Sequence, residues 1–336
     1  MYYAQLRKLL FRYEPEVAHR YVLQALRVAY KFGIPKLFPE PPAPSLEVMG
    51  LTFKNAIGLA AGFDKNGEYI DELAALGFGF IEVGTVTPKP QAGNPPPRIF
   101  RIPEQQAIIN RLGFNNKGCD YLISQLKKIR YQGVLGINIG KNHDTPLESA
   151  VDDYLYCYRR VAPYASYVVI NISSPNTVAL RDLQHGEKLR KLLKTLKDEQ
   201  EIILEFQKKY VPLVVKLAPD LSDEELQSTA EIILVEKLDG VIATNTTLKR
   251  DGIDLKEEGG ISGKPLQALS TIVVQKLHKI LQDRIPIIGV GGIMSAKDAE
   301  EKFAAGAKLI QLYTGLIYEG PGLIYNIARY FKRINA

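Results

Sequence analysis

Short runs of apolar, often β-branched residues alternate with amphipathic stretches along most of the chain. Eight of these runs end in small or amide residues and predict strands over residues 55–60, 80–85, 134–139, 167–172, 214–217, 241–245, 287–290 and 309–314. Apolar residues recur at helical spacing between and after them, which predicts helices over 68–76, 118–131, 146–161, 188–210, 223–237, 266–281, 295–305 and 323–333. Eight strand–helix units in succession are typical of an α/β fold, the closed (β/α)8 TIM barrel.

A doubly wound open sheet is the structural alternative. It requires a G-x-G-x-x-G turn after its first strand, and the sequence GLAAG at residues 58–62 lacks that spacing. The barrel is therefore the predicted fold, and it places the active site at the C-terminal ends of the strands.

The chain before the first strand has a different character. Residues 5–12 and 15–32 predict two helices, because Pro15 is tolerated in a first turn and the sequence GIP at 33–35 ends the second. The proline-rich residues 39–44 predict a stiff, extended linker. The predicted organisation is an amphipathic helical extension (1–38), a linker (39–44) and a catalytic barrel (45–336).

Charge separates the same two parts. The chain of 336 residues carries a net charge of +6; residues 1–36 hold seven basic and two acidic side chains, a net charge of +5 that leaves +1 for the rest. A nearly neutral barrel does not favour a nucleic-acid partner, whereas a basic, aromatic extension favours an anionic membrane surface. No apolar run is long enough to span a bilayer, and no secretory signal is present. Two cysteines without C-x-x-C spacing indicate neither a disulfide framework nor a metal site.

Three predicted strands end in asparagine, at Asn138, Asn171 and Asn245. An isolated asparagine in such a place is more often a cap for the following helix or turn. Three of them around one barrel favour an inward-facing amide lining, which suits a planar polar heterocycle because amides both donate and accept hydrogen bonds.

Two lysines add charge to the predicted site. Lys216 lies within an otherwise apolar strand, where an ammonium requires a partner: an electron-rich ring of a ligand or, as the alternative, an interior carboxylate. Lys65 follows the first strand through a loop of small residues that allows close approach of a ligand, although the adjacent Asp64 is an alternative partner for it.

Glycines predict a phosphate site between the last two strands. The sequence GVGG at 289–292 ends strand seven before a helix, and YTG at 313–315 ends strand eight, which is where barrels often bind a phosphate. The sequence GGISGK at 259–264 resembles a P-loop only superficially, since Glu258 replaces its first glycine and Pro265 follows the lysine.

The sequence NISSPNT at 171–177 leads into a long loop of the kind that often forms a lid. The four histidines and the absence of a G-x-S-x-G elbow argue against a serine triad. A serine in this loop is instead a candidate proton acceptor.

Five motifs carry a resemblance to a known family. AAGFDK at 60–65, TPKP at 87–90, NRLGFN at 110–115, NISSPNT at 171–177 and GVGG at 289–292 together resemble dihydroorotate dehydrogenase. The helical extension and Ser174 are similar to the membrane-associated, quinone-reducing class of that family, because the soluble class has a cysteine at that position and lacks the extension. The resemblance runs along essentially the whole chain.

The resemblance implies an FMN-containing barrel that oxidises dihydroorotate to orotate in the biosynthesis of UMP. Ser174 would remove the C5 proton while hydride passes from C6 to the flavin, with Thr177 beside it. The substrate-binding residues would be Lys65, Asn110, Arg111, Leu112, Gly113, Phe114, Asn171, Asn176, Asn245 and Thr246. The FMN-binding residues would be Ala61, Gly62, Phe63, Asp64, Lys65, Thr85, Asn138, Asn171, Lys216, Thr244, Gly263, Gly292, Tyr313 and Thr314.

The resemblance also implies that ubiquinone or menaquinone takes the electrons. A tunnel through the extension would be lined by His19, Arg101 and Tyr313, although His19 alone reads equally as a helix-packing histidine. The protein would be a monomer or weak homo-oligomer, peripheral to the cytoplasmic side of a bacterial inner membrane. Two rival hypotheses are a barrel lyase or isomerase that binds the phosphate of its own substrate, and a protein whose basic extension is its whole function.

Overall fold

The computed structural model describes residues 2–37, 40–177, 179–250, 252–253 and 256–334. Residues 38 and 39, where the predicted extension meets the predicted linker, lie outside the described residues, as do both chain termini. Everything below refers to the described residues.

Eight parallel strands form the closed barrel that the sequence predicts, and that prediction is confirmed. Each strand agrees with its predicted span to within two residues at either end, and β13 pairs with β3 to close the ring. The strands are β3 (Ile57–Leu59), β4 (Phe80–Val86), β7 (Val134–Ile139), β8 (Tyr167–Asn171), β9 (Leu213–Leu217), β10 (Gly240–Ala243), β12 (Ile287–Val290) and β13 (Ala307–Leu312).

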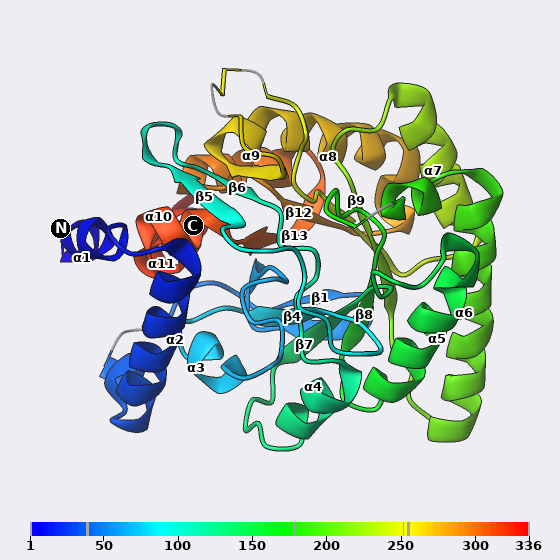
Figure 1. The fold of residues 1–336 in the computed structure, drawn as a ribbon, viewed down its shortest axis with the longest axis horizontal. Coiled ribbons are helices and arrows are strands. Elements are labelled where there is room, and N and C mark those ends of the chain that lie inside the picture. Colours follow the sequence, from blue (N-terminus) through cyan, green and yellow to red (C-terminus); the bar gives the residue numbers. More distant parts are fainter. Residues whose placement is uncertain (1, 38–39, 178, 251, 254–255, 335–336) are drawn as a thin grey trace.

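Helices surround these strands (Figure 1). Local signals set several of their bounds: a capping box of Ser222 and Glu225 begins α7, and the Ser295 side chain caps α9. The helices are α3 (Ile70–Ala74), α4 (Cys119–Leu126), α5 (Ala150–Val161), α6 (Gly186–Gln207), α7 (Asp223–Val235), α8 (Gln267–Leu281), α9 (Ala296–Ala304), α10 (Thr314–Glu319) and α11 (Gly322–Ile334). The short 3-10 turns are η1 (Ile34–Leu37), η2 (Pro103–Gln105), η3 (Leu147–Ser149), η4 (Leu180–Gln184), η5 (Lys264–Leu266) and η6 (Gln282–Arg284).

The barrel interior changes from apolar to polar along its axis. Because alternate residues of a strand share one face, Val169 and Asn171 of β8 both point inward, as do Val214 and Lys216 of β9. The apolar members of this inner face form a cluster that includes Phe80, whereas the polar members stand one layer nearer the C-terminal ends. Polar chemistry is therefore concentrated at one end of the barrel.

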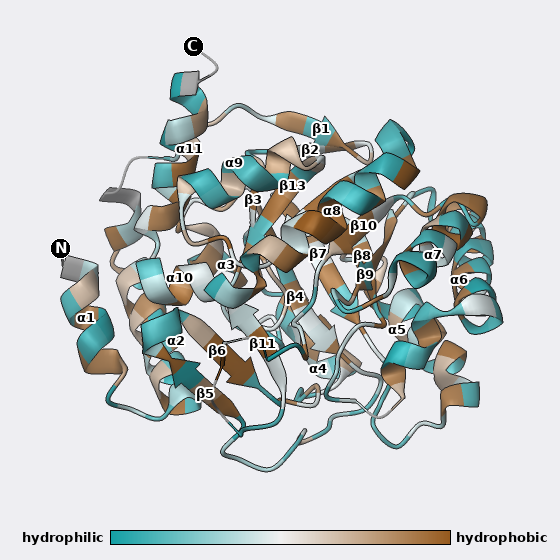
Figure 2. Cartoon of the chain, turned by 90° about the horizontal axis from the view of Figure 1, so that it is seen from above, coloured by the Kyte–Doolittle hydropathy of each residue, from teal (hydrophilic) through white to brown (hydrophobic). Residues whose placement is uncertain are grey.

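Two small sheets close the ends, and the sequence patterns did not predict either. The hairpin of β1 (Leu46–Val48) and β2 (Leu51–Phe53) packs Phe53 edge-to-face on Phe80 at the apolar end, with ring centroids 5.1 Å apart. An antiparallel sheet of β5 (Ile99–Ile102), β6 (Ala107–Asn110) and β11 (Gly260–Gly263) stands at the other end (Figure 2). The loops after β4 and β10 supply its strands, so it forms part of the catalytic face.

The two N-terminal helices lie at that same end of the barrel (Figure 2). The first, α1 (Tyr2–Leu10), begins and ends a few residues before its predicted span; α2 (Pro15–Lys31) agrees with its own to one residue. The Tyr3 hydroxyl of α1 donates to the Ile317 carbonyl of α10 at 2.7 Å, and Glu16 of α2 pairs with Arg98 at 2.9 Å. Within the described residues, no helix is both long enough and apolar enough to cross a membrane.

Candidate active site

A cavity opens at the C-terminal ends of the strands, and its volume with the open mouth is about 970 Å³. Its walls are formed by the ends of barrel strands, by the loops that follow them, and by β6 and β11. The predicted site residues that line it are Ala61, Gly62, Lys65, Thr85, Asn110, Leu112, Gly113, Phe114, Asn171, Ser174, Asn176, Lys216, Thr244, Asn245, Thr246, Gly263, Gly292, Tyr313 and Thr314.

An amide network forms one side of the cavity floor. Asn171 donates to the Thr85 hydroxyl at 2.8 Å and to the Asn138 side-chain oxygen at 3.1 Å. Asn138 in turn donates to Glu82 at 2.9 Å and is completely buried. Asn171 and Asn245 therefore line the cavity, while Asn138 points into the barrel interior beneath it and orients Asn171.

Lys216 projects from β9 into the same floor. No carboxylate lies within ion-pair distance of it among the described residues, so the alternative of an interior ion pair is not what the structure shows. Burial lowers the pKa of its ammonium, and the charge of Glu82 opposes that shift. Gln311 of β13 also faces the cavity, and its buried side-chain oxygen has no hydrogen-bond partner in the described structure. Both groups remain available to a polar ligand.

Lys65 stands on the opposite wall without the partner that its neighbour suggested. The Asp64 carboxylate accepts from the backbone N–H groups of Glu68 and Tyr69, at 3.0 and 2.7 Å, ahead of α3. Lys65 instead donates to the Asn115 side chain. Burial of the Lys65 ammonium lowers its pKa to about 7. The charge of Arg98 adds to this shift, and the charge of Glu16 opposes it. The alternative of neutralisation by Asp64 is therefore wrong, and the ammonium is available to an anion in the cavity.

The loop after β8 brings Ser174 over the cavity. Its hydroxyl accepts from the Asn176 backbone at 3.2 Å, and the residue is 6% exposed. The Asn176 side chain donates to the Asn110 carbonyl of β6 at 3.1 Å, which joins this loop to the small sheet. The buried Thr177 hydroxyl has no partner among the described residues. The wall thus carries the Ser174 hydroxyl, held by a backbone donor, and the unpartnered Thr177 hydroxyl lies buried three residues further along the loop.

The far end of the cavity is built from backbone. Gly292 has a φ of +71°, and a Cβ there would lie 2.3 Å from the Gln267 Cα. Gly263 has a φ of +95°, and a Cβ there would lie 2.2 Å from the Gln106 carbonyl oxygen. Only glycine fits both places, and the N–H groups of α10 start beside them without a side-chain cap at Tyr313. Such a cradle suits a phosphate.

Several predicted residues are not part of the cavity wall. Arg111 lies just beyond the end of β6, is not among the wall residues and pairs with Glu257 at 2.8 Å. Phe63 and Asp64 lie behind the wall, like Asn138. The structure therefore places Arg111 away from the site to which the resemblance assigned it.

The residues predicted for a tunnel fall into two groups. His19 of α2 contacts the Phe63 carbonyl through Nε2 at 2.8 Å, and burial lowers its pKa. The Phe63 ring packs edge-to-face between His19, at 4.9 Å, and Tyr313, at 5.6 Å, so these three form a continuous aromatic path to the cavity. Arg101 stands apart from them, donates to the Tyr13 carbonyl at 2.9 Å and stacks over Phe11.

Sequence reasoning missed a support for the glycine cradle. Lys302 of α9 is fully buried and donates to the hydroxyls of Ser270 and Thr271, both at 2.6 Å. Ser270 donates to the Gly291 carbonyl at 3.0 Å. A lysine in an amphipathic helix is normally predicted to face solvent, so the sequence did not indicate that Lys302 is buried.

A pocket above the strand ends is where (β/α)8 enzymes carry out their chemistry, and the chain is an enzyme of that class. The sequence model of the family described as dihydroorotate dehydrogenase matches residues 45–334. The chain belongs to the dihydroorotate dehydrogenase family.

Proteins named dihydroorotate dehydrogenase (quinone) are similar along the whole chain. The protein of Nitrosospira multiformis is 54% identical, with 100% of this chain and 97% of that protein covered. The protein of Cellvibrio japonicus is 54% identical, with 96% of each covered. Among solved structures, DHODH from Eimeria tenella in complex with ferulenol has a TM-score of 0.87 and 40% identity, covering 95% of this chain and 91% of that one.

Proposed function

We propose that the protein oxidises dihydroorotate to orotate, with FMN as hydride acceptor and a membrane quinone as final acceptor, in the biosynthesis of UMP. The observation that carries this is that one cavity is lined by Ser174 and by two lysines, neither of which forms an ion pair with a carboxylate of the described residues. The family and its quinone-named relatives supply the reaction, and the cavity supplies groups that suit each part of it.

The residues present fit FMN. The cavity lies at the mouth of the barrel, and the glycine cradle at one end offers backbone N–H groups that suit a phosphate. Lys216 and the unpartnered oxygen of Gln311 offer polar contacts for a heterocycle. Bound there, FMN would supply a two-electron acceptor for the hydride that leaves C6 of dihydroorotate. The residues that would hold it are Ala61, Gly62, Thr85, Asn171, Lys216, Thr244, Gly263, Gly292, Tyr313 and Thr314.

Dihydroorotate is an anion with a polar ring, and the opposite wall provides complementary groups. The Lys65 ammonium is placed to neutralise its carboxylate. Asn110, Asn171, Asn176 and Asn245 offer amides to the ring, with Thr246 beside them. Leu112, Gly113 and Phe114 complete the wall by contact. Arg111, Phe63, Asp64 and Asn138 act only through residues that they hold in place.

Ser174 is the proposed base that removes the proton at C5. A free serine hydroxyl is a poor base, so its environment has to hold it in place and provide an exit for the proton. The Asn176 N–H fixes its oxygen, and the unpartnered Thr177 hydroxyl is the neighbour through which a proton can leave.

Electrons are proposed to leave along the side occupied by the extension. The aromatic path from Tyr313 through Phe63 to His19 ends on α2 and gives quinone a route toward the cavity. Arg101 would act nearer the surface, beside α1. The extension bears exposed apolar side chains, among them Phe32 at 81%, Val28 at 55% and Leu9 at 50%. With its basic residues these suit an anionic bilayer.

We infer the same organisation that the sequence predicts: residues 1–38 as membrane and quinone-access extension, 39–44 as linker and 45–336 as FMN-binding barrel. The family match from residue 45 supports the last boundary. The protein would rest on the cytoplasmic side of a bacterial inner membrane as a monomer or weak homo-oligomer, with ubiquinone or menaquinone as its acceptor and without a nucleic-acid partner.

Anaerobic reduction tests the proposal. The purified protein should contain FMN, and the visible absorption band of the oxidised flavin should bleach when dihydroorotate is added without oxygen. Re-oxidation should follow addition of a quinone analogue but not of fumarate or NAD, tried in parallel. A protein that takes up no FMN, or whose FMN stays oxidised with dihydroorotate, would contradict the proposed reaction.

A further inference from the structure

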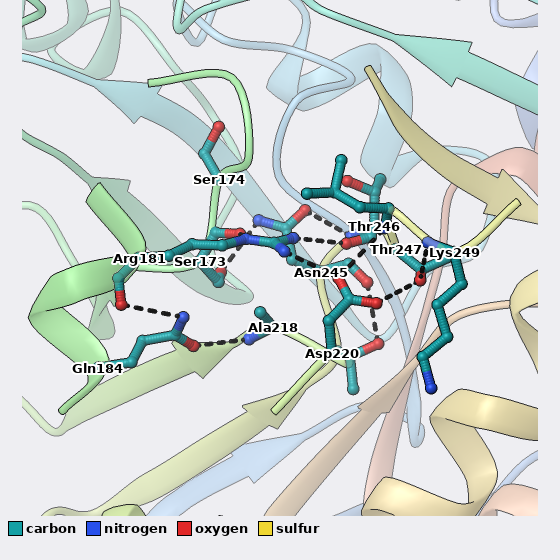
Figure 3. Close-up of polar contacts among 12 residues, drawn as sticks. Ser173, Ser174, Arg181, Gln184, Ala218, Asp220, Asn245, Thr246, Thr247 and Lys249 are labelled. Carbon is teal, nitrogen blue, oxygen red and sulfur yellow. Dashed lines mark hydrogen bonds and ion pairs between the residues drawn. The ribbon is translucent and has the colours of Figure 1, made fainter. Parts of the chain in front are cut away.

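Arg181 joins three neighbouring strand ends behind the cavity wall. It belongs to η4, which follows the Ser174 loop, and its guanidinium makes three hydrogen bonds. Nε donates to the Ser173 carbonyl at 3.1 Å, Nη2 to the Thr246 carbonyl at 2.9 Å and Nη1 to the Asp220 carboxylate at 2.8 Å (Figure 3). These acceptors follow β8, β10 and β9, which are adjacent in the barrel.

Asp220 anchors this guanidinium. The two side chains are only 20% and 17% exposed, and backbone carbonyls alone do not balance a buried positive charge. The same carboxylate accepts from the Leu248 N–H at 3.1 Å and from the Thr247 hydroxyl. The ion pair is thus built into a network that fixes the segment after β10 as well as the guanidinium.

The bond to Ser173 bears directly on Ser174. The Ser173 carbonyl belongs to the peptide plane that also contains the Ser174 nitrogen and Cα, so holding that oxygen limits the directions that the Ser174 side chain can take. The Ser173 hydroxyl separately accepts from Asn245 at 3.0 Å. In Figure 3 the Ser174 hydroxyl points away from the guanidinium, so the two do not contact each other. Any influence of Arg181 on Ser174 passes through the backbone.

The bond to the Thr246 carbonyl connects the same guanidinium to a second part of the cavity wall. Thr246 lines the cavity, as does Ser174, whereas Arg181 does not. One rigid, planar group therefore fixes the distance between the wall that carries the base and the wall that carries ring-binding groups. A displacement of about 1 Å between reacting groups costs on the order of a hundredfold in rate.

We propose that Arg181, anchored by Asp220, is a positioning residue that sets the Ser174 hydroxyl against the bound substrate. The inference rests on the proposed role of Ser174 as the base. It assigns a function to two residues that lie outside the cavity wall. The segments that follow β8, β9 and β10 would then hold the base in the position from which it removes the proton.

Rapid anaerobic mixing of the FMN-loaded, full-length enzyme with dihydroorotate tests the proposal. Arg181→Gln should slow flavin reduction about 10- to 100-fold, while FMN content and the dissociation constant of orotate change less than about threefold. Arg181→Lys should recover part of the rate, because an ammonium restores charge and one or two of the three bonds. Asp220→Asn should slow reduction as well, and it serves as the second variant if Arg181→Gln does not fold.

Arg159→Gln is the matched control. Arg159 pairs with Glu199 at 2.6 Å between α5 and α6, outside the cavity wall, and its loss should leave the reduction rate unchanged. A wild-type rate in folded Arg181→Gln, or in folded Asp220→Asn when only that variant folds, would overturn the positioning role.

Combination with Ser174→Ala separates this inference from the proposed function. If Arg181 acts through Ser174, adding Arg181→Gln to Ser174→Ala should lower the residual rate less than about twofold. An equal slowing in both backgrounds would show that Arg181 acts by another route and would overturn the inference while Ser174 keeps its role. Undiminished reduction by Ser174→Ala alone would remove the base and this inference with it.

Discussion

The charge state of Lys65 makes substrate binding sensitive to pH in the physiological range. Its ammonium is proposed to bind the substrate carboxylate, and protein crowding lowers its pKa to about 7, from an ordinary value near 10.5. The protonated form binds the anion, so binding is strongest well below pH 7, is halved near pH 7 and is lost progressively as pH rises further. The anion should in turn raise the pKa, so that binding takes up a proton.

The size of the effect follows from the protonated fraction. With a pKa of about 7, roughly half of the molecules carry a protonated Lys65 at pH 7 and about 3% do so at pH 8.5. Because the apparent dissociation constant varies inversely with the competent fraction, the constant for orotate should rise about 16-fold between these two values. Below pH 6.5 the curve should flatten.

Titration of the FMN-loaded enzyme with orotate, followed by the change in flavin absorption, measures this constant across pH 6.5–8.5. Lys65→Gln should bind weakly with little pH dependence, because it cannot carry a charge. Lys65→Arg keeps its charge throughout, so whatever affinity it retains should also be nearly independent of pH. A flat profile in the wild type, or an undiminished slope in Lys65→Gln, would refute the reasoning.

Three further predictions concern separate parts of the molecule. Gly292→Ala should weaken FMN binding by about 2–4 kcal/mol, because the new Cβ meets the Gln267 backbone and φ stays positive; FMN retained at the wild-type dissociation constant would contradict this. Phe32→Glu should lower partitioning onto anionic vesicles at least about tenfold without changing flavin reduction, which equal sedimentation with vesicles would disprove. Leu193→Ala, in the buried face of α6, should lower the free energy of unfolding by about 2–5 kcal/mol in urea titrations while the reduction rate of the folded enzyme stays the same; an unchanged unfolding midpoint would count against a well-packed core there.

The eight barrel strands were predictable because each is a short, mostly apolar run that ends in small or amide residues. The strands β5, β6 and β11 were not, because each spans four residues and lacks a distinctive pattern. β11 in addition pairs with β6 across about 150 residues of sequence, which local periodicity does not report.

Within the site, proximity in sequence misled in two places. Asp64 and Lys65 are adjacent, yet the carboxylate turns to the first N–H groups before α3. Arg111 follows Asn110 in one motif, yet its guanidinium pairs with Glu257 and not with a group in the cavity. Lys216, by contrast, was found from the cost of leaving an ammonium among apolar residues, and Lys65 from the loop of small residues that precedes it. The pairing of Arg181 with Asp220 brings together segments 39 residues apart, so only the fold reveals it.

The β1–β2 hairpin also fixes which way the molecule faces. It covers the apolar end of the barrel, where Phe53 packs on Phe80. Both helices of the extension lie at the opposite end, with α1 held to α10 by Tyr3 and α2 joined to the catalytic face through Glu16 and Arg98. If the extension rests on a surface, the end of the barrel where the cavity opens therefore faces that surface, and the end covered by the β1–β2 hairpin faces away from it.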